Sequence, residues 1–88
     1  MIMPAYTHDY RESTRDKIDR LPDFQREVIK KKINQICENP HHYKPLKHPM
    51  DGYRRVHILN SFVLIFSIDE TKKVVIIEEY EHHDKVYR

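Results

Sequence analysis

The apolar segment Phe62–Ile68 constrains the fold more than any other part of the chain. Its sequence, FVLIFSI, puts apolar side chains on both faces of a strand, which is typical of a central strand covered on both sides. Asp69–Lys72 is typical of a hairpin loop, and Lys73–Tyr80 supplies an apolar partner strand. Before the segment, Gly52 opens a strand over Tyr53–Ile58, in which apolar and polar side chains alternate. These three consecutive strands are expected to form an antiparallel meander.

Two amphipathic helices are expected ahead of the strands. Side chains recur at helical spacing in the first at Tyr10, Thr14, Ile18 and Leu21, with charged residues between them. A broad apolar face in the second comprises Phe24, Val28, Ile29, Ile33, Ile36 and Cys37. Pro22 suits the first turn of the second helix, and Asn39-Pro40 ends it. The tight turn at Pro22 therefore predicts a helical hairpin.

The N-terminal segment carries weaker signals. Pro4 interrupts it, so Ala5–Thr7 forms at best a short edge strand. Asp9 or Thr7 is then positioned to cap the first helix. The whole pattern predicts an α+β fold of one domain, residues 1–88, with a helical hairpin packed on a small antiparallel sheet in the order β-α-α-β-β-β. Two helices cover one face of such a sheet, so a partner chain or the returning C-terminal segment is expected to cover the other.

Charge is informative in its distribution rather than in its sum. The chain has 16 Lys+Arg and 14 Asp+Glu, which gives a net charge of +2. Between residues 41 and 57, however, four cations (Lys44, Lys47, Arg54 and Arg55) are accompanied by one acidic residue and four histidines. This basic stretch favours a phosphate-bearing partner, and an ordinary solvated loop is the alternative.

The single cysteine and the hydropathy pattern bear on the compartment. Cys37 excludes an internal disulfide, lies in a helical pattern as an expected small core residue, and is consistent with a reducing cytoplasm. The longest apolar run ends at Phe66, so neither a signal peptide nor a membrane span is expected.

The C-terminal segment, residues 82–88 (HHDKVYR), is dense in ionisable groups directly after strand-like sequence. Histidine is the side chain that normally titrates nearest neutrality, so His82 and His83 are candidate acid/base groups. On the strand Tyr53–Ile58, a period of two puts Arg55 and His57 on one face, where they are expected to meet the C-terminal segment across the sheet. The structural alternatives are a hydrogen-bonded histidine pair at the sheet edge and an exposed polar strand face.

A metal site is not expected, although the chain has seven histidines. Adjacent histidines in a strand point to opposite faces, so pairs such as His41-His42 rarely bind one ion together. No HxxxH or CxxC spacing is present. The sequence therefore predicts neither a metal nor another cofactor.

Several segments together resemble the RelE/ParE toxin superfamily. They are Leu46-Lys47, Gly52–His57, Phe62–Asp69 and the ending His82–Arg88, so the resemblance spans nearly the whole chain. The ending is the most specific part, because it is similar to the family's His-Arg-x-Asp-Val-Tyr finish. The resemblance implies a toxin that a cognate antitoxin neutralises.

Three modes of action are open within this resemblance. RelE-type members enter the ribosomal A site and cleave mRNA without metal, and an mRNA interferase of this kind is the leading expectation. ParE-type members share the fold and inhibit DNA gyrase instead. A degenerate member would only bind its antitoxin and operator DNA.

The resemblance also implies roles for individual residues. Arg55 and His57 match the family's Arg-x-Arg strand, with His57 in place of the second Arg. His82 and Tyr87 match the terminal His and Tyr, and His83 stands where Arg is common. Val63, in contrast, occupies the position of an Arg that helps RelE-type members hold the scissile phosphate. Tyr87 has a structural alternative too, as an aromatic ring that packs the C-terminal segment down.

RNA cleavage by its own 2′-hydroxyl needs a base, an acid and a cation. His82 or His83 with His57 is expected to form the proton-transfer pair, while Tyr87 stacks on a base or binds a phosphate. The candidate catalytic residues are His82, His83, Tyr87, Arg55 and His57, and the candidate RNA- or phosphate-binding residues are Lys44, Lys47 and Arg54.

Overall fold

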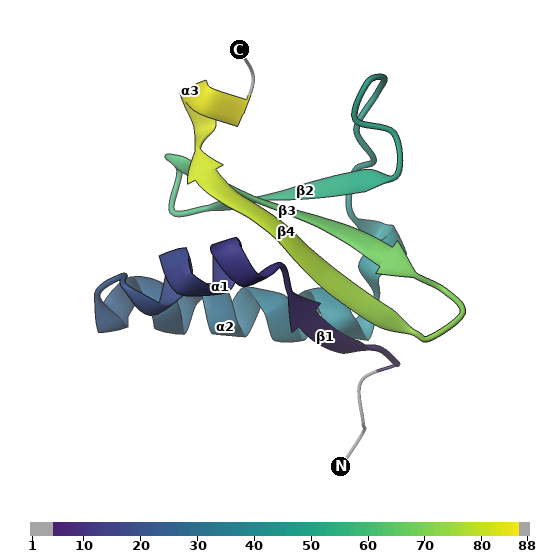
Figure 1. The fold of residues 1–88 in the computed structure, drawn as a ribbon, viewed down its shortest axis with the longest axis horizontal. Coiled ribbons are helices and arrows are strands. Elements are labelled where there is room, and N and C mark those ends of the chain that lie inside the picture. Colours follow the sequence, from purple (N-terminus) through teal and green to yellow (C-terminus); the bar gives the residue numbers. More distant parts are fainter. Residues whose placement is uncertain (1–4, 87–88) are drawn as a thin grey trace.

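The computed structural model describes residues 5–86, which form helices packed on one face of a sheet (Figure 1). The elements are β1 Thr7–Tyr10, α1 Glu12–Asp19, α2 Asp23–Glu38, the short 3-10 helix η1 Pro40–His42, β2 Tyr53–Ile58, β3 Phe62–Asp69, β4 Val74–His82 and α3 His83–Val86. The sheet has the order β1-β4-β3-β2. The predicted α+β class and the order β-α-α-β-β-β are confirmed, and α3 is added at the end.

The edge strand β1 differs from the prediction. It runs parallel to β4 from Thr7 to Tyr10, so the sheet is mixed, while the other neighbouring strands are antiparallel. Asp9 therefore lies within a strand, and neither it nor Thr7 caps α1. The N-cap residue is Arg11, which makes no side-chain capping bond. The prediction was wrong here because pairing with β4, more than sixty residues away, decides where the strand ends.

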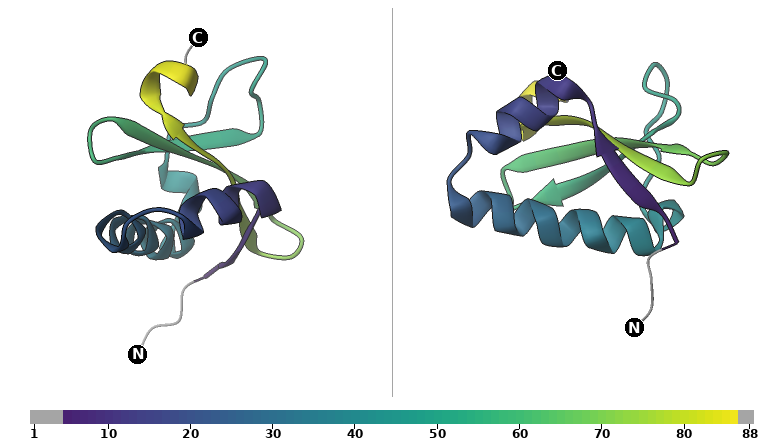
Figure 2. Two further views of the ribbon diagram at one scale, coloured as in Figure 1. Left: turned by 60° about the vertical axis from the view of Figure 1, so that its left-hand side comes forward. Right: turned by 60° about the horizontal axis from the view of Figure 1, so that its bottom comes forward.

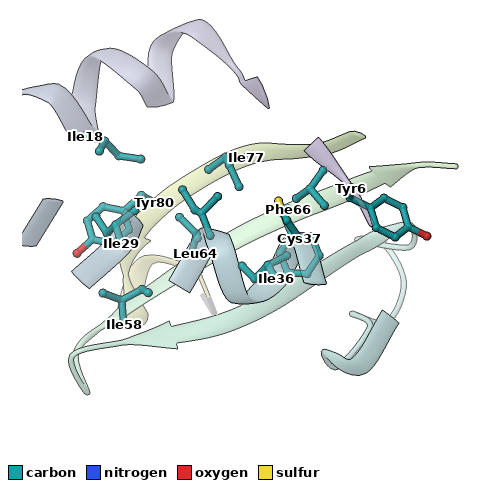
Figure 3. Packing of buried hydrophobic residues seen from close by; sticks show 12 residues of the cluster. Tyr6, Ile18, Ile29, Ile36, Cys37, Ile58, Leu64, Phe66, Ile77 and Tyr80 are labelled. Atoms are coloured by element: carbon teal, nitrogen blue, oxygen red, sulfur yellow. The ribbon is translucent and has the colours of Figure 1, made fainter. Parts of the chain in front are cut away.

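One hydrophobic core fills the space between the helices and the inner face of the sheet (Figures 2 and 3). Its helical side is formed by Ile18, Ile29, Ile33, Ile36 and Cys37, and its sheet side by Leu64, Phe66, Val75, Ile77 and Tyr80. Each fully buried side chain of this size contributes about 1.5–3 kcal/mol. The prediction for Phe24 was wrong, since this side chain is 68% exposed. Phe24 precedes Ile29 by five residues, and at 3.6 residues per turn this separation turns its side chain to the far side of α2.

The central strand β3 is buried on both faces, as its sequence predicted. On the face away from α2, Val63 and Ile65 are almost completely buried. Side chains of the flanking strands surround them, and α3 contacts both β3 and β4. The C-terminal segment thus returns over this face, which we call the open face because α1 and α2 lie on the other side.

Within residues 5–86, no helix combines the length and the apolar character that crossing a membrane requires.

Candidate functional site

The open face of β2 carries the polar side chains that the alternation predicted. Tyr53, Arg55 and His57 share this face, opposite the core side chain Ile58. In register, Arg55 lies beside Ile65 of β3, and His57 lies beside Val63. A cation, an imidazole and an aromatic ring therefore stand in a row over an apolar floor.

His83 meets this row. Its ring stacks on that of His57, with ring centroids 5.6 Å apart and an interplanar angle of 25°. The backbone N–H of His83 donates to the carbonyl of Ser61 at 2.8 Å, which fixes the start of α3 beside the turn between β2 and β3. The predicted meeting of the β2 face with the C-terminal segment is therefore found between His57 and His83.

His82 lies on the other face of β4. It pairs in register with Phe62, and the two rings meet edge to face at 5.5 Å. It lines a hollow of about 280 Å³ together with Leu21, Tyr80 and Lys17, on the side of the helices. The two adjacent histidines thus face opposite ways, because β4 ends at His82 and the chain turns into α3 at His83.

The carboxylate of Asp84 lies close to both histidines. One of its oxygens lies 3.8 Å from Nδ1 of His82, and the other lies 3.8 Å from Nδ1 of His83. It is 82% exposed, so these pairs are weak and screened. Tyr87, predicted to act beside the histidines, lies outside the described residues. Between residues 5 and 86, no group of three or more potential metal ligands is close enough to hold an ion.

The three predicted phosphate-binding cations are spread out. Arg54 lies on the core side of β2, where its guanidinium donates to the carbonyl of Tyr43 at 2.6 Å. Lys44 and Lys47 are exposed in the loop before β2. The carbonyl of Lys44 accepts a bond of 3.3 Å from the backbone N–H of Arg55, so Lys44 lies at the edge of the open face. The structure thus brings Lys44 near Arg55 but gives the Arg54 side chain a loop-holding contact.

Cations from the N-terminal part of the chain, not anticipated from the sequence, neutralise the acidic end of β4. Arg11 pairs with Glu79 at 3.4 Å. Lys17 forms an ion pair with Glu81 and also donates to the carbonyl of Tyr80 at 3.2 Å. No local sequence pattern predicts these pairs, because each joins residues more than sixty positions apart.

A second polar cluster, which contains one histidine, lies at the hairpin between β3 and β4. Glu70 accepts hydrogen bonds from Lys73 at 2.7 Å and from the hydroxyl of Tyr6 at 2.6 Å, and it also contacts His41. The hydrogen bonds from Lys73, Tyr6 and His41 lower the pKa of Glu70 from 4.5 to about 2. The same carboxylate raises the pKa values of Lys73 and Tyr6. These four residues, the Glu70 cluster, join the start of β1, η1 and the hairpin, since Tyr6 directly precedes β1.

Solved structures share this architecture. The isolated RelE toxin of E. coli superposes with a TM-score of 0.75 at 23% identity, over 89% of this chain and 84% of that one. The toxin–antitoxin complex RelBE2 of Mycobacterium tuberculosis gives a TM-score of 0.75 at 22% identity, over 92% and 100%. The chain therefore has the RelE-like fold.

Sequence comparison identifies the family. Residues 9–87 match the ParE toxin of type II toxin–antitoxin systems. A protein of Methanocaldococcus jannaschii named RelE4 is 44% identical over 72 residues, which cover 82% of this chain and 77% of that protein. The chain belongs to the ParE toxin family within the RelE/ParE superfamily, as the resemblance predicted, and is a toxin of a type II toxin–antitoxin system.

Proposed function

We propose that this toxin is an mRNA interferase that cleaves RNA through attack of the 2′-hydroxyl on the adjacent phosphate. The observation that supports this most is the stacked pair of His57 and His83 on the face that also carries Arg55. Two imidazoles in contact, with a guanidinium on the same strand face, are the residue types that such a reaction requires.

The chemistry assigns a role to each group. One ring of the pair takes the proton of the 2′-hydroxyl, and the other protonates the leaving 5′-oxygen. Arg55 stabilises the charge that develops on the phosphate, and Tyr87 stacks on a base or binds a phosphate. His82, Lys44, Lys47 and Arg54 remain candidates for outer contacts with the RNA.

Two partners belong to this proposal. The first is a cognate antitoxin, in keeping with the solved RelBE2 pair whose toxin shares the fold. The second is the ribosome, on which RelE-type toxins meet mRNA. Cleavage there would use the protein's own side chains, without a cofactor.

A second function rests on a specific observation. Val63 lies directly beside His57, where RelE-type members carry an Arg, and β4 places Glu79 and Glu81 on the neighbouring strand. Fewer cations and more carboxylates weaken attraction for RNA. The alternative is a ParE-like toxin that inhibits DNA gyrase by binding.

One experiment separates these functions. The chain is expressed under tight control and added to translating extracts, where cleaved mRNA is mapped, and to a gyrase supercoiling assay. New mRNA ends that disappear in His57→Ala and His83→Ala, but persist in His42→Ala on the exposed η1, are the expected result. Intact mRNA together with inhibited supercoiling would establish the alternative, and harmless expression with tight antitoxin binding would indicate a degenerate member.

A further inference from the structure

A β-bulge beside the histidine pair gives β4 two consecutive side chains on the open face. Phe66 pairs with Ile77 and Ile65 pairs with Glu79, so Glu78 has no register partner on β3. In a regular strand Glu78 and Glu79 would point to opposite faces. Here both line one hollow, because a bulge redirects the side chains that follow it.

The bulge is held in place from the helical layer. The hydroxyl of Thr14 on α1 donates to the carbonyl of Glu78 at 2.6 Å, and Thr14 is only 2% exposed. The backbone N–H of Arg11 donates to the carbonyl of Ile77 at 2.9 Å. Two bonds from one segment therefore fix the backbone on both sides of the redirected residue.

The carboxylate of Glu78 is oriented as well. The hydroxyl of Ser67 on β3 donates to one of its oxygens at 2.7 Å. Among residues 5–86 no other group donates a hydrogen bond to that carboxylate, so its second oxygen keeps its capacity to accept. A built carboxylate of this kind, with a fixed backbone and one fixed oxygen, suits recognition of hydrogen-bond donors.

The hollow has the composition of a nucleobase site. It measures about 140 Å³ and is lined by Tyr53, Met50, Ile65, Arg11, Glu78 and Glu79. The aromatic and apolar groups offer surfaces for stacking, as in single-stranded RNA recognition. The Arg11–Glu79 pair offsets part of the negative charge that would otherwise repel a phosphate backbone.

The hollow also lies next to the proposed cleavage site. Ile65, part of its floor, pairs in register with Arg55. Tyr53 lies two residues from Arg55 along β2, which is roughly 7 Å, and four residues from His57, which is roughly 13 Å. An RNA strand that places one phosphate at Arg55 therefore brings a neighbouring base to the hollow.

We propose that this hollow is a base-recognition subsite in which Glu78 selects guanine, an inference that rests on the proposed RNA-cleaving function. Guanine presents two adjacent donors, N1–H and the exocyclic amine, on its Watson–Crick edge, and a carboxylate accepts both. Adenine and cytosine each offer a single amine there, and uracil a single imide N–H. Glu78 is thus a specificity residue, and Thr14 and Ser67 are positioning residues.

The test measures binding apart from cleavage. Dissociation constants are determined for short single-stranded RNAs that differ at one base, with the His83→Ala variant so that the RNA stays intact. The guanine-containing RNA is expected to bind about tenfold more tightly than the other three. Glu78→Gln should abolish this preference and favour adenine, because an amide pairs with adenine in two bonds. Glu27→Gln, the same change on the exposed side of α2, should keep the preference for guanine.

A second variant distinguishes a loss of guanine recognition from a folding defect. Ser67→Ala leaves the carboxylate in place but removes the bond that orients it, so the guanine preference should fall while the circular dichroism spectrum stays that of the wild type. Equal binding of all four RNAs, no measurable binding of any, or an unchanged preference in Glu78→Gln would each overturn the subsite.

The outcome is separable from the proposed function. Cleavage of mRNA with no base preference in binding leaves the interferase standing and overturns the subsite. A guanine preference that Glu78→Gln removes, without any cleavage, supports the subsite and overturns the interferase.

Discussion

Two polar clusters that contain histidine lie at different parts of the sheet, and they differ in the charge of the groups around the histidine. At the Glu70 cluster, the carboxylate lies among Lys73, Tyr6 and His41, so charge and hydrogen-bonding capacity are matched inside the protein. On the open face, His57 and His83 stack on each other beside a strand position occupied by Arg55. Asp84, whose carboxylate lies 3.8 Å from Nδ1 of His83, is 82% exposed.

This difference underlies our proposal that the Glu70 cluster is a structural clamp and the open face a reactive site. A matched cluster is at its lowest free energy without a ligand, since its groups already have partners. The open face instead brings together a guanidinium and two imidazoles, which are residue types that bind phosphate. Residue type alone does not distinguish these histidines, whereas the charges of their neighbours do.

The largest expected effect is a loss of mRNA cleavage when a residue of the open face is replaced. His83→Ala removes one of the two proton-transfer groups, so mRNA cleavage should fall by about 10²–10⁴-fold. His82→Ala changes the adjacent residue on the opposite face and should reduce cleavage much less. Rates are measured with a defined mRNA in a translating extract, and equal losses in both variants would contradict the assignment of the pair to His57 and His83.

The pH dependence gives the next largest effect. If one ring acts as base and the other as acid, the cleavage rate should be greatest near neutrality and fall on both sides. A single-turnover rate measured from about pH 5 to 9 checks this, with thermal unfolding at each pH as the control for folding. A flat profile would mean that Arg55 acts by positioning and charge alone.

The next prediction tests whether Arg54 stabilises the fold rather than binding RNA. Its guanidinium holds the carbonyl of Tyr43, so Arg54→Ala should lower the free energy of unfolding by about 2 kcal/mol. Urea denaturation measures this, and Lys47→Ala in the same loop is the matched control with a change near zero. If cleavage falls sharply in Arg54→Ala while stability is unchanged, the side chain contacts RNA as the sequence predicted.

The smallest effect concerns Glu70. Its pKa lies below the ordinary value of 4.5, at about 2, so the charged form is favoured by folding. This contribution to stability is complete above pH 4.5 and disappears as the pH falls through about 2. Glu70→Gln should therefore be less stable than the wild type at pH 7 but nearly equal to it at pH 2, with unchanged cleavage at pH 7. An equal stability difference at both pH values would show that the clamp does not depend on this charge.

Local patterns predicted much of the fold. The alternation over Tyr53–Ile58, the doubly apolar Phe62–Ile68 and the stop at Asn39-Pro40 all correspond to observed elements. The same patterns failed at Phe24 and at β1. In both cases the outcome depended on which neighbour a segment packs against rather than on its own composition.

The candidate site was predicted in part. The pairing of the β2 face with the C-terminal segment followed from alternation and from strand order. The choice between His82 and His83 did not, because a bulge at Glu78 shifts the facing of every later residue in β4. The contacts of Arg11, Thr14 and Lys17 with β4 were also invisible, since each joins segments far apart in the chain.

The sequence by itself determined the helical hairpin and the three consecutive strands after it, that β3 lies centrally, and that polar groups gather at the C-terminus and on one face of β2. These properties follow from the periodicity of apolar residues, which each segment carries alone. The tertiary structure decided the parallel direction of β1, the bulge in β4, the facing of His83 toward His57 and the contacts of Glu70 with its three partners. These depend on register between distant segments, and one residue of register moves a side chain from the core to the open face.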